Sequence, residues 1–253
     1  MRTNSVKQYI QKTSETPTSE VVAKGGVSNA QHIVDCVAQW SLDNRVQLNS
    51  EKCKELRISF TKKQSEFHPI LVNGNQLEVV RSAKLLGVII TSDLSWNEHV
   101  NETVKKACKR LCFLVQLKQA RLPCRDLFLL YATCIRSILA YAAPVFFYAL
   151  PKYLQCELER LQKRALPIFF LSLSYDEALS KAGIPTIISY CEDICDKVFN
   201  SALGNKDNKL NKLLTEDNEA PYSLRNHGHF VLPKWKRDCF KNTFISSSCL
   251  KYN

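Results

Sequence analysis

Positively charged side chains recur at helical spacing between residues 97 and 121. Lys105, Lys106, Lys109 and Arg110 fall on one side of a helix with ideal geometry, roughly opposite its apolar residues. Such a row is typical either of the solvent-exposed face of an amphipathic helix or of a surface that contacts phosphate groups. Phosphate contacts of this kind carry no sequence information. The full set of candidate nucleic-acid-binding residues is Lys105, Lys106, Lys109, Arg110, Lys118, Arg121, Lys163 and Arg164.

The element that must position these cations is a long amphipathic helix that follows an apolar strand. Residues of the helix that share the apolar face are Val100, Val104, Ala107, Leu111, Leu114 and Val115. Asp93 and Ser95 supply turn and cap chemistry before the helix, and Glu98 places an acid in its first turn. The apolar run Lys84–Thr91 predicts a mostly buried strand.

Composition favours an anionic partner. The 253 residues carry a formal net charge of +11, for which nucleic acid is the usual partner and a membrane surface is the competitor. The 11 cysteines follow an N-terminal stretch that has no apolar core segment, so we expect reduced thiols in the nucleus or cytoplasm and no secretion. Pairs such as Cys108–Cys112 lack the spacing of a structural zinc site, and we expect no bound metal.

The chain order predicts an α+β fold, with a small antiparallel sheet followed by a mainly helical region. Residues 1–27 read as a loose polar tail. Within residues 28–95 we expect a helix from Ser28 or Asn29 to Asn44, a strand with Leu56 and Ile58 alternating, and a hairpin around Asn73-Gly74-Asn75.

Residues 96–214 read as helical, and residues 215–253 as irregular. Helices are expected from Pro123 to about Tyr141, from Pro151 until Pro167 stops the helix, over 175–183, and from Pro185 onward. Arg136 is the only charge in residues 127–150. This stretch is long enough to span a bilayer, but a charge near its middle and Pro144 favour a buried helix of a soluble protein.

Several separated motifs in one order resemble the non-LTR (LINE-type) retrotransposon reverse transcriptases. The motifs are KLLGVIITSDLSWNEHV, KRLCFLVQLKQA and IRSILAYAAPVFFYALPKYLQCELERLQKRAL. The resemblance implies the end of a polymerase palm followed by a thumb-like helical region. It implies that Leu85, Leu86, Gly87 and Val88 begin the strand pair that grips the primer end. It also assigns Lys52, in LNSEKC, to the family lysine that is thought to protonate leaving pyrophosphate.

The metal-binding aspartates of that family are missing from this chain. The family places two of them in a Tyr-x-Asp-Asp turn, and the nearest match here is Tyr9-Ile10-Gln11-Lys12. A protonated lysine cannot bind Mg²⁺ and glutamine brings no charge to hold it. We therefore expect no cofactor in this chain, although the intact family enzyme would use Mg²⁺, and no polymerisation by this chain alone.

The resemblance predicts a truncated remnant of an RNA-directed DNA polymerase that binds RNA or an RNA–DNA duplex weakly and without sequence preference. A missing polymerase half is a further partner it implies. Two alternatives stay open at this point. One is a helical protein-interaction module with no nucleic-acid role, and the other is a membrane-associated protein that uses residues 127–150.

Overall fold

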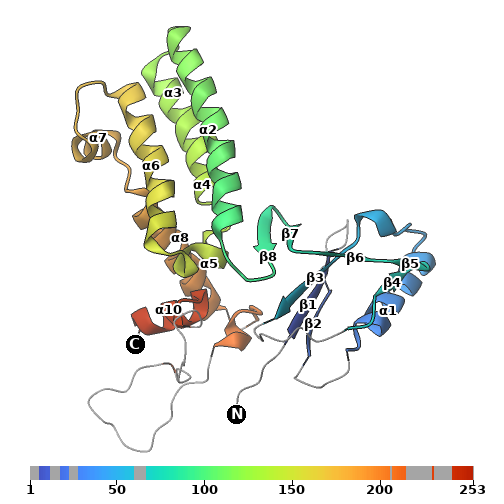
Figure 1. Cartoon of the computed structure of the whole chain (residues 1–253). Coiled ribbons are helices and arrows are strands. Elements are labelled where there is room, and N and C mark those ends of the chain that lie inside the picture. Colours follow the sequence, from blue (N-terminus) through green and yellow to red (C-terminus); the bar gives the residue numbers. More distant parts are fainter. Residues whose placement is uncertain are drawn as a thin grey trace, which may run out of the picture. The chain divides into compact units, whose positions relative to one another are not determined.

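The computed structural model describes residues 6–11, 18–22, 28–59, 67–205, 207–214, 230 and 241–252. The chain divides into two compact units, Met1–His99 and Val100–Asn253, which are described one at a time (Figure 1). The first unit carries all the described strands of the sheets, and the second is built from helices. The predicted α+β class, mainly helical with small sheets, is confirmed.

The sheet of the first unit contains β1 (Val6–Gln11), β2 (Thr18–Val22), β3 (Lys54–Ser59) and β6 (Glu78–Val80) in the order β2-β1-β3-β6. β1 pairs antiparallel with β2 and with β3, whereas β3 and β6 run parallel. The prediction of a loose tail over residues 1–27 is therefore wrong for β1 and β2. Strand β2 pairs only with β1, whereas β1 also pairs with β3, whose residues lie more than 40 positions further along the chain. A pairing over that distance has no local sequence pattern that could predict it.

Helix α1 (Ala30–Asp43) and the hairpin of β4 (Leu71–Val72) and β5 (Asn75–Gln76) form the core beside this sheet. The helix bounds and the hairpin match the prediction. Asn73 and Gly74 both have positive φ, 52° and 78°, as a two-residue hairpin turn requires. The shared core residues are Ala30, Val34, Cys53, Ile70, Val72 and Leu77.

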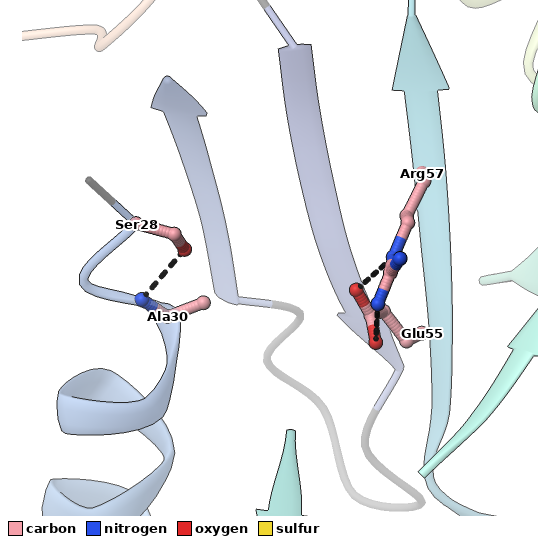
Figure 2. A network of polar contacts seen from close by, with 4 residues as sticks. All are labelled: Ser28, Ala30, Glu55 and Arg57. Carbon is pink, nitrogen blue, oxygen red and sulfur yellow. Dashed lines mark hydrogen bonds and ion pairs between the residues drawn. The ribbon is translucent and has the colours of Figure 1, made fainter. Parts of the chain in front are cut away.

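Two polar contacts in this unit fix local geometry (Figure 2). The Ser28 hydroxyl accepts a hydrogen bond from the N–H of Ala30 at 3.2 Å, at the start of α1. In β3 the Glu55 carboxylate is fully buried and accepts two N–H bonds from the Arg57 guanidinium, at 2.6 and 3.2 Å. A buried carboxylate is tolerated because this two-point contact compensates its charge.

The apolar run predicted as one strand, Lys84–Thr91, folds as a tight hairpin. β7 (Ser82–Leu85) and β8 (Val88–Thr91) pair antiparallel, with Leu85 opposite Val88. The two residues between the strands, Leu86 and Gly87, have φ values of 46° and 86°. The single-strand prediction was wrong because a leucine in the left-handed region is uncommon, so the turn carries no Asn-Gly signature.

The second unit begins with α2 (Asn97–Gln119), whose first turn lies in the first unit. The elements that follow, each by its residues, are α3 (Cys124–Leu130), the π-helix η2 (Tyr131–Arg136), α4 (Ser137–Leu139), α5 (Ala143–Phe146), η3 (Phe147–Ala149), α6 (Lys152–Phe169), α7 (Tyr175–Ala182), α8 (Ile187–Gly204), η4 (Asn211–Leu213) and α10 (Phe244–Tyr252). Gly183 ends α7 with a φ of 62°, as predicted.

Two predicted helix ends are wrong. Pro167 lies inside α6, which continues to Phe169. A proline so near the end of a helix removes only one hydrogen bond, and Phe169 holds the last turn with its ring 5.8 Å from that of Phe128 and 5.9 Å from that of Tyr131. The stretch 215–253 was expected to be irregular, but its end forms α10. The rings of Phe244 and Tyr252 lie 6.3 and 5.2 Å from that of Phe199 in α8.

Candidate nucleic-acid interface

The start of α2 is fixed by a polar turn around Asp93. Its carboxylate accepts hydrogen bonds from the Thr91 hydroxyl at 2.6 Å and from the N–H of Ser95 at 3.1 Å. These two donors, the hydroxyl first, hold the pKa of Asp93 below its usual value. The turn chemistry predicted for Asp93 is thus present, four residues before α2 begins at Asn97.

Helix α2 separates an apolar face from a cationic one. Val100, Ala107 and Leu114 are buried, at 1, 0 and 2% exposure, as the spacing predicts. Val115, expected on the same face, is instead exposed at 38%. The predicted cations Lys105, Lys106, Lys109 and Arg110 are all exposed.

The four cations of α2 are not equivalent. The Lys105 ammonium forms an ion pair with Glu102 at 2.9 Å. Hydrogen bonding to Lys105 lowers the pKa of Glu102, with smaller contributions from the charges of Lys106 and Lys109. Among the residues that the structure describes, neither Lys106 nor Lys109 forms an ion pair of its own. Their charges are therefore available to an anionic partner.

Arg110 links α2 to the neighbouring π-helix. Its guanidinium Nη1 donates a hydrogen bond to the carbonyl oxygen of Cys134 at 2.7 Å. This contact uses one of the five N–H donors of the side chain and fixes its direction. Arg110 is thus both a part of the exposed cationic face and a link between α2 and η2.

Arg164 brings the basic pair of α6 to α2. Its Nη1 lies 3.6 Å from the sulfur of Cys108, one residue before Lys109. The Lys163 ammonium lies 5.1 Å above the ring of Tyr175 in α7. Figure 1 shows α2, α3 and α6 running alongside one another. The cations of α2 and Arg164, distant in sequence, therefore belong to one surface.

The surface continues around the end of α2. Lys118 is half-buried in the last turn, and Arg121, with a φ of 62°, follows the helix end. Cations at a helix C-terminus are favourable because the last carbonyl groups carry partial negative charge. Arg125, exposed in the first turn of α3, extends the set, and the sequence analysis missed it. The absence of any acid between Thr103 and Arg125 was the signal that could have found it.

A buried polar network holds α6 in place beneath this surface. Gln162, which has no exposed surface, accepts a hydrogen bond from the Tyr131 hydroxyl at 2.7 Å. Its amide nitrogen donates to the Tyr175 hydroxyl at 3.2 Å and to the Pro185 carbonyl at 3.0 Å. The Glu159 carboxylate accepts from the Tyr175 hydroxyl and, at 3.2 Å, from the N–H of Ile188.

This network ties α6 to η2, α7 and the start of α8. Burial raises the pKa of Tyr131 and of Tyr175 well above the usual tyrosine value, and the bond to Glu159 adds to the shift at Tyr175. Both hydroxyls are therefore protonated donors throughout the physiological range. These bonds fix the helix that carries Lys163 and Arg164.

Arg136, the one charge in the apolar stretch, is buried within the second unit. Its guanidinium donates to the Pro185 carbonyl at 3.1 Å and lies 4.0 Å above the ring of Tyr190. Cys124–Ala149 is the one stretch among the described residues that is long and apolar enough to cross a membrane. Its helix ends at Leu139, however, and the chain turns at Ala142, where φ is 57°.

The residues assigned by resemblance to primer contact lie at the tip of the β7–β8 hairpin, in the first unit. Leu85 and Val88 close the turn, Leu86 is 71% exposed, and Gly87 allows the tight loop. Lys52 is exposed at the end of the short 3₁₀ helix η1 (Ser50–Lys52), and its backbone N–H lies 3.3 Å from the Asn49 side chain. The hairpin tip is a second candidate contact point, and it belongs to the first unit.

In the described part of the chain, no group of three or more His, Cys, Asp or Glu side chains lies close enough together to hold a metal ion. Of the cysteines that the structure describes, ten carry free thiols. Burial raises the pKa of the Cys191 and Cys195 thiols to about 12. These two thiols are inert at neutral pH and belong to the core of α8.

Comparison with known proteins gives one short match. The family model described as alkylated DNA repair protein alkB homolog 8, N-terminal, matches residues 96–137. The match begins just before α2 and ends just after η2, and it covers less than a fifth of the chain. The search of curated proteins and the search of solved structures find no match.

Proposed function

We propose that this chain binds nucleic-acid duplex through phosphate groups, without reading sequence, as the palm-end and thumb-like part of a non-LTR retrotransposon reverse transcriptase. The observation that carries the binding proposal is the contact between Arg164 and Cys108, which joins the cations of α6 to those of α2. One surface then presents exposed cations from two helices. The sequence has no acidic residue between Glu102 in α2 and Asp126 in α3. The proposal assigns no polymerase activity to this chain alone.

The assay is a fluorescence-anisotropy titration of a labelled RNA–DNA hybrid with the whole chain at several salt concentrations. Phosphate contacts weaken binding as salt rises, with a log–log slope of about −0.9 for each phosphate neutralised. Four contacts would give a slope of about −3.6, and a dissociation constant of roughly 1–100 μM at physiological salt is expected for non-specific binding.

The informative variant is Lys106→Glu/Lys109→Glu, because both lysines are exposed and form no ion pair among the described residues. Loss of two contacts should make the slope shallower by about 1.8. Lys152→Glu/Lys197→Glu makes the same change in net charge with exposed lysines on α6 and α8, and serves as the control. A binding constant independent of salt, or equal weakening in both double variants, would show that the surface is only solvated.

A protein-interaction module is the second candidate function. It is favoured by large apolar side chains that are exposed in the second unit: Leu129, Tyr141, Val145 and Tyr153, between 54 and 61%. Scattered exposed apolar residues are normal, whereas a contiguous exposed apolar patch marks a docking surface. This candidate function therefore requires that the four side chains act as one patch. Salt separates the two functions, since association through apolar contact should not weaken as salt rises.

A further inference from the structure

The cationic face of α2 contains an exposed aromatic ring. Phe113 is 58% exposed, which leaves roughly 100 Å² of apolar surface facing solvent. It lies one helical turn beyond Lys109 and Arg110, displaced about 40° from the first and 60° from the second around the helix axis. The ring therefore stands between two cations, both of which are also exposed.

We propose that Phe113 is a stacking platform for an unpaired base, so that the α2 surface binds single-stranded nucleic acid more tightly than phosphate contact alone would allow. Two requirements select this partner. The cations require an anion, and the exposed ring requires a flat apolar group beside it. A nucleotide strand supplies both in each unit, because its phosphates can meet Lys109 and Arg110 while a base covers the ring.

The neighbourhood of the ring supports this assignment. The bond from Arg110 to the Cys134 carbonyl fixes the direction of one cation that lies on the same face of α2 as Phe113. Leu117, half-buried one turn further on, extends the apolar surface along the same flank. No acidic residue lies within ten positions on either side of Phe113 in the sequence, so nothing local repels a phosphate backbone.

This inference rests on the proposed function, and the test separates the two. The ligands are a 12-nucleotide oligothymidine and an abasic oligonucleotide with the same number of phosphates, both labelled at one end, together with the RNA–DNA hybrid. Stacking of one base predicts that oligothymidine binds the whole chain about 5- to 150-fold more tightly than the abasic strand. Phe113→Ala should abolish that difference and leave the salt slope unchanged, whereas Phe113→Trp should retain it.

A second measurement reports stacking directly. A 2-aminopurine base placed in the oligonucleotide should lose fluorescence on binding to the wild-type chain and not on binding to Phe113→Ala. Because Phe113 is exposed, the variant should fold, and circular dichroism checks this. Equal binding of oligothymidine and the abasic strand would overturn the stacking platform, even if both bind with a salt slope.

Failure of the proposed function looks different, since then neither the hybrid nor the abasic strand would bind with a salt slope. An interfacial role at a membrane is the remaining competitor for an aromatic ring among cations. Vesicles containing phosphatidylserine test it. If Phe113→Ala weakens binding to the vesicles and leaves oligonucleotide binding unchanged, the ring is a membrane contact and the proposal is wrong.

Discussion

Replacing Gln162 by leucine should destabilise the helical unit, because the buried Tyr131 hydroxyl would lose its hydrogen-bond acceptor. Gln162 has no exposed surface and gives the Tyr131 hydroxyl its acceptor at 2.7 Å. The Tyr175 hydroxyl would keep its bond to Glu159, and the Pro185 carbonyl would keep its bond from Arg136. Among the described residues, only the Tyr131 hydroxyl loses its acceptor, so the cost is that of one unsatisfied buried donor, about 1–3 kcal/mol.

A double-mutant cycle tests that reasoning. Tyr131→Phe alone leaves the Gln162 oxygen without a donor and should cost about 1–2 kcal/mol. Tyr131→Phe/Gln162→Leu removes both partners together and should be nearly as stable as the wild type, because two apolar groups of similar shape then face each other. The sum of the two single costs should therefore exceed the double cost by at least about 2 kcal/mol, as expected for residues coupled in one hydrogen-bond network.

Urea unfolding followed by far-ultraviolet circular dichroism measures the free energies, because most described helix lies in the second unit. Thr133→Ser, an exposed position on the same π-helix, is the control and should change the free energy of unfolding little. Additive single costs would show that Gln162 and Tyr131 do not depend on each other. A stable Gln162→Leu variant would refute the network as the element that holds α6.

Two further predictions follow from burial and backbone geometry. The buried thiols of Cys191 and Cys195 have pKa values raised to about 12, so their neutral form is favoured in the folded chain. This stabilisation is fully present below the unfolded-state value of about 9 and is lost as pH rises from 9 towards 12, by up to about 1.36 kcal/mol per pH unit for each thiol. The fall in unfolding free energy between pH 8 and 11 should therefore be smaller in Cys191→Ala/Cys195→Ala than in the wild type, and equal falls would contradict the burial. Gly183→Ala should cost about 1 kcal/mol in urea unfolding, since nothing lies within 4 Å of the added carbon and the cost comes only from the φ of 62°. Gly183→Asn should cost less, and an Ala variant as stable as the wild type would show that the left-handed cap is not required.

Local signals predicted much of the fold because several elements here are specified by neighbouring residues. The Asn73-Gly74 turn and the Gly183 end of α7 each depend on a left-handed backbone conformation that one or two residues favour. The Leu86-Gly87 turn uses the same left-handed geometry with a leucine, which carries no such preference. It was therefore missed.

Long-range contacts set the features that the sequence could not indicate. β1 pairs with β3 across more than 40 residues, and its many polar residues did not predict a strand. Pro167 was expected to stop α6, but the helix continues two residues further to Phe169, whose ring packs against those of Phe128 and Tyr131. The network through Gln162 joins four elements, and no spacing rule relates its members. In each case tertiary contact, which local propensity does not contain, decided the outcome.

Cations that the sequence cannot distinguish make different contacts in the structure, and this difference determines which variants can test nucleic-acid binding. Arg110 and Arg164 each use guanidinium N–H groups on a neighbouring helix, so their removal alters packing as well as charge. Lys105 shares its charge with Glu102. Lys106 and Lys109 are the α2 cations whose loss changes the potential of the surface and little else. A binding defect in an arginine variant would thus be ambiguous, whereas the same defect in the paired lysine variant assigns the contact to phosphate.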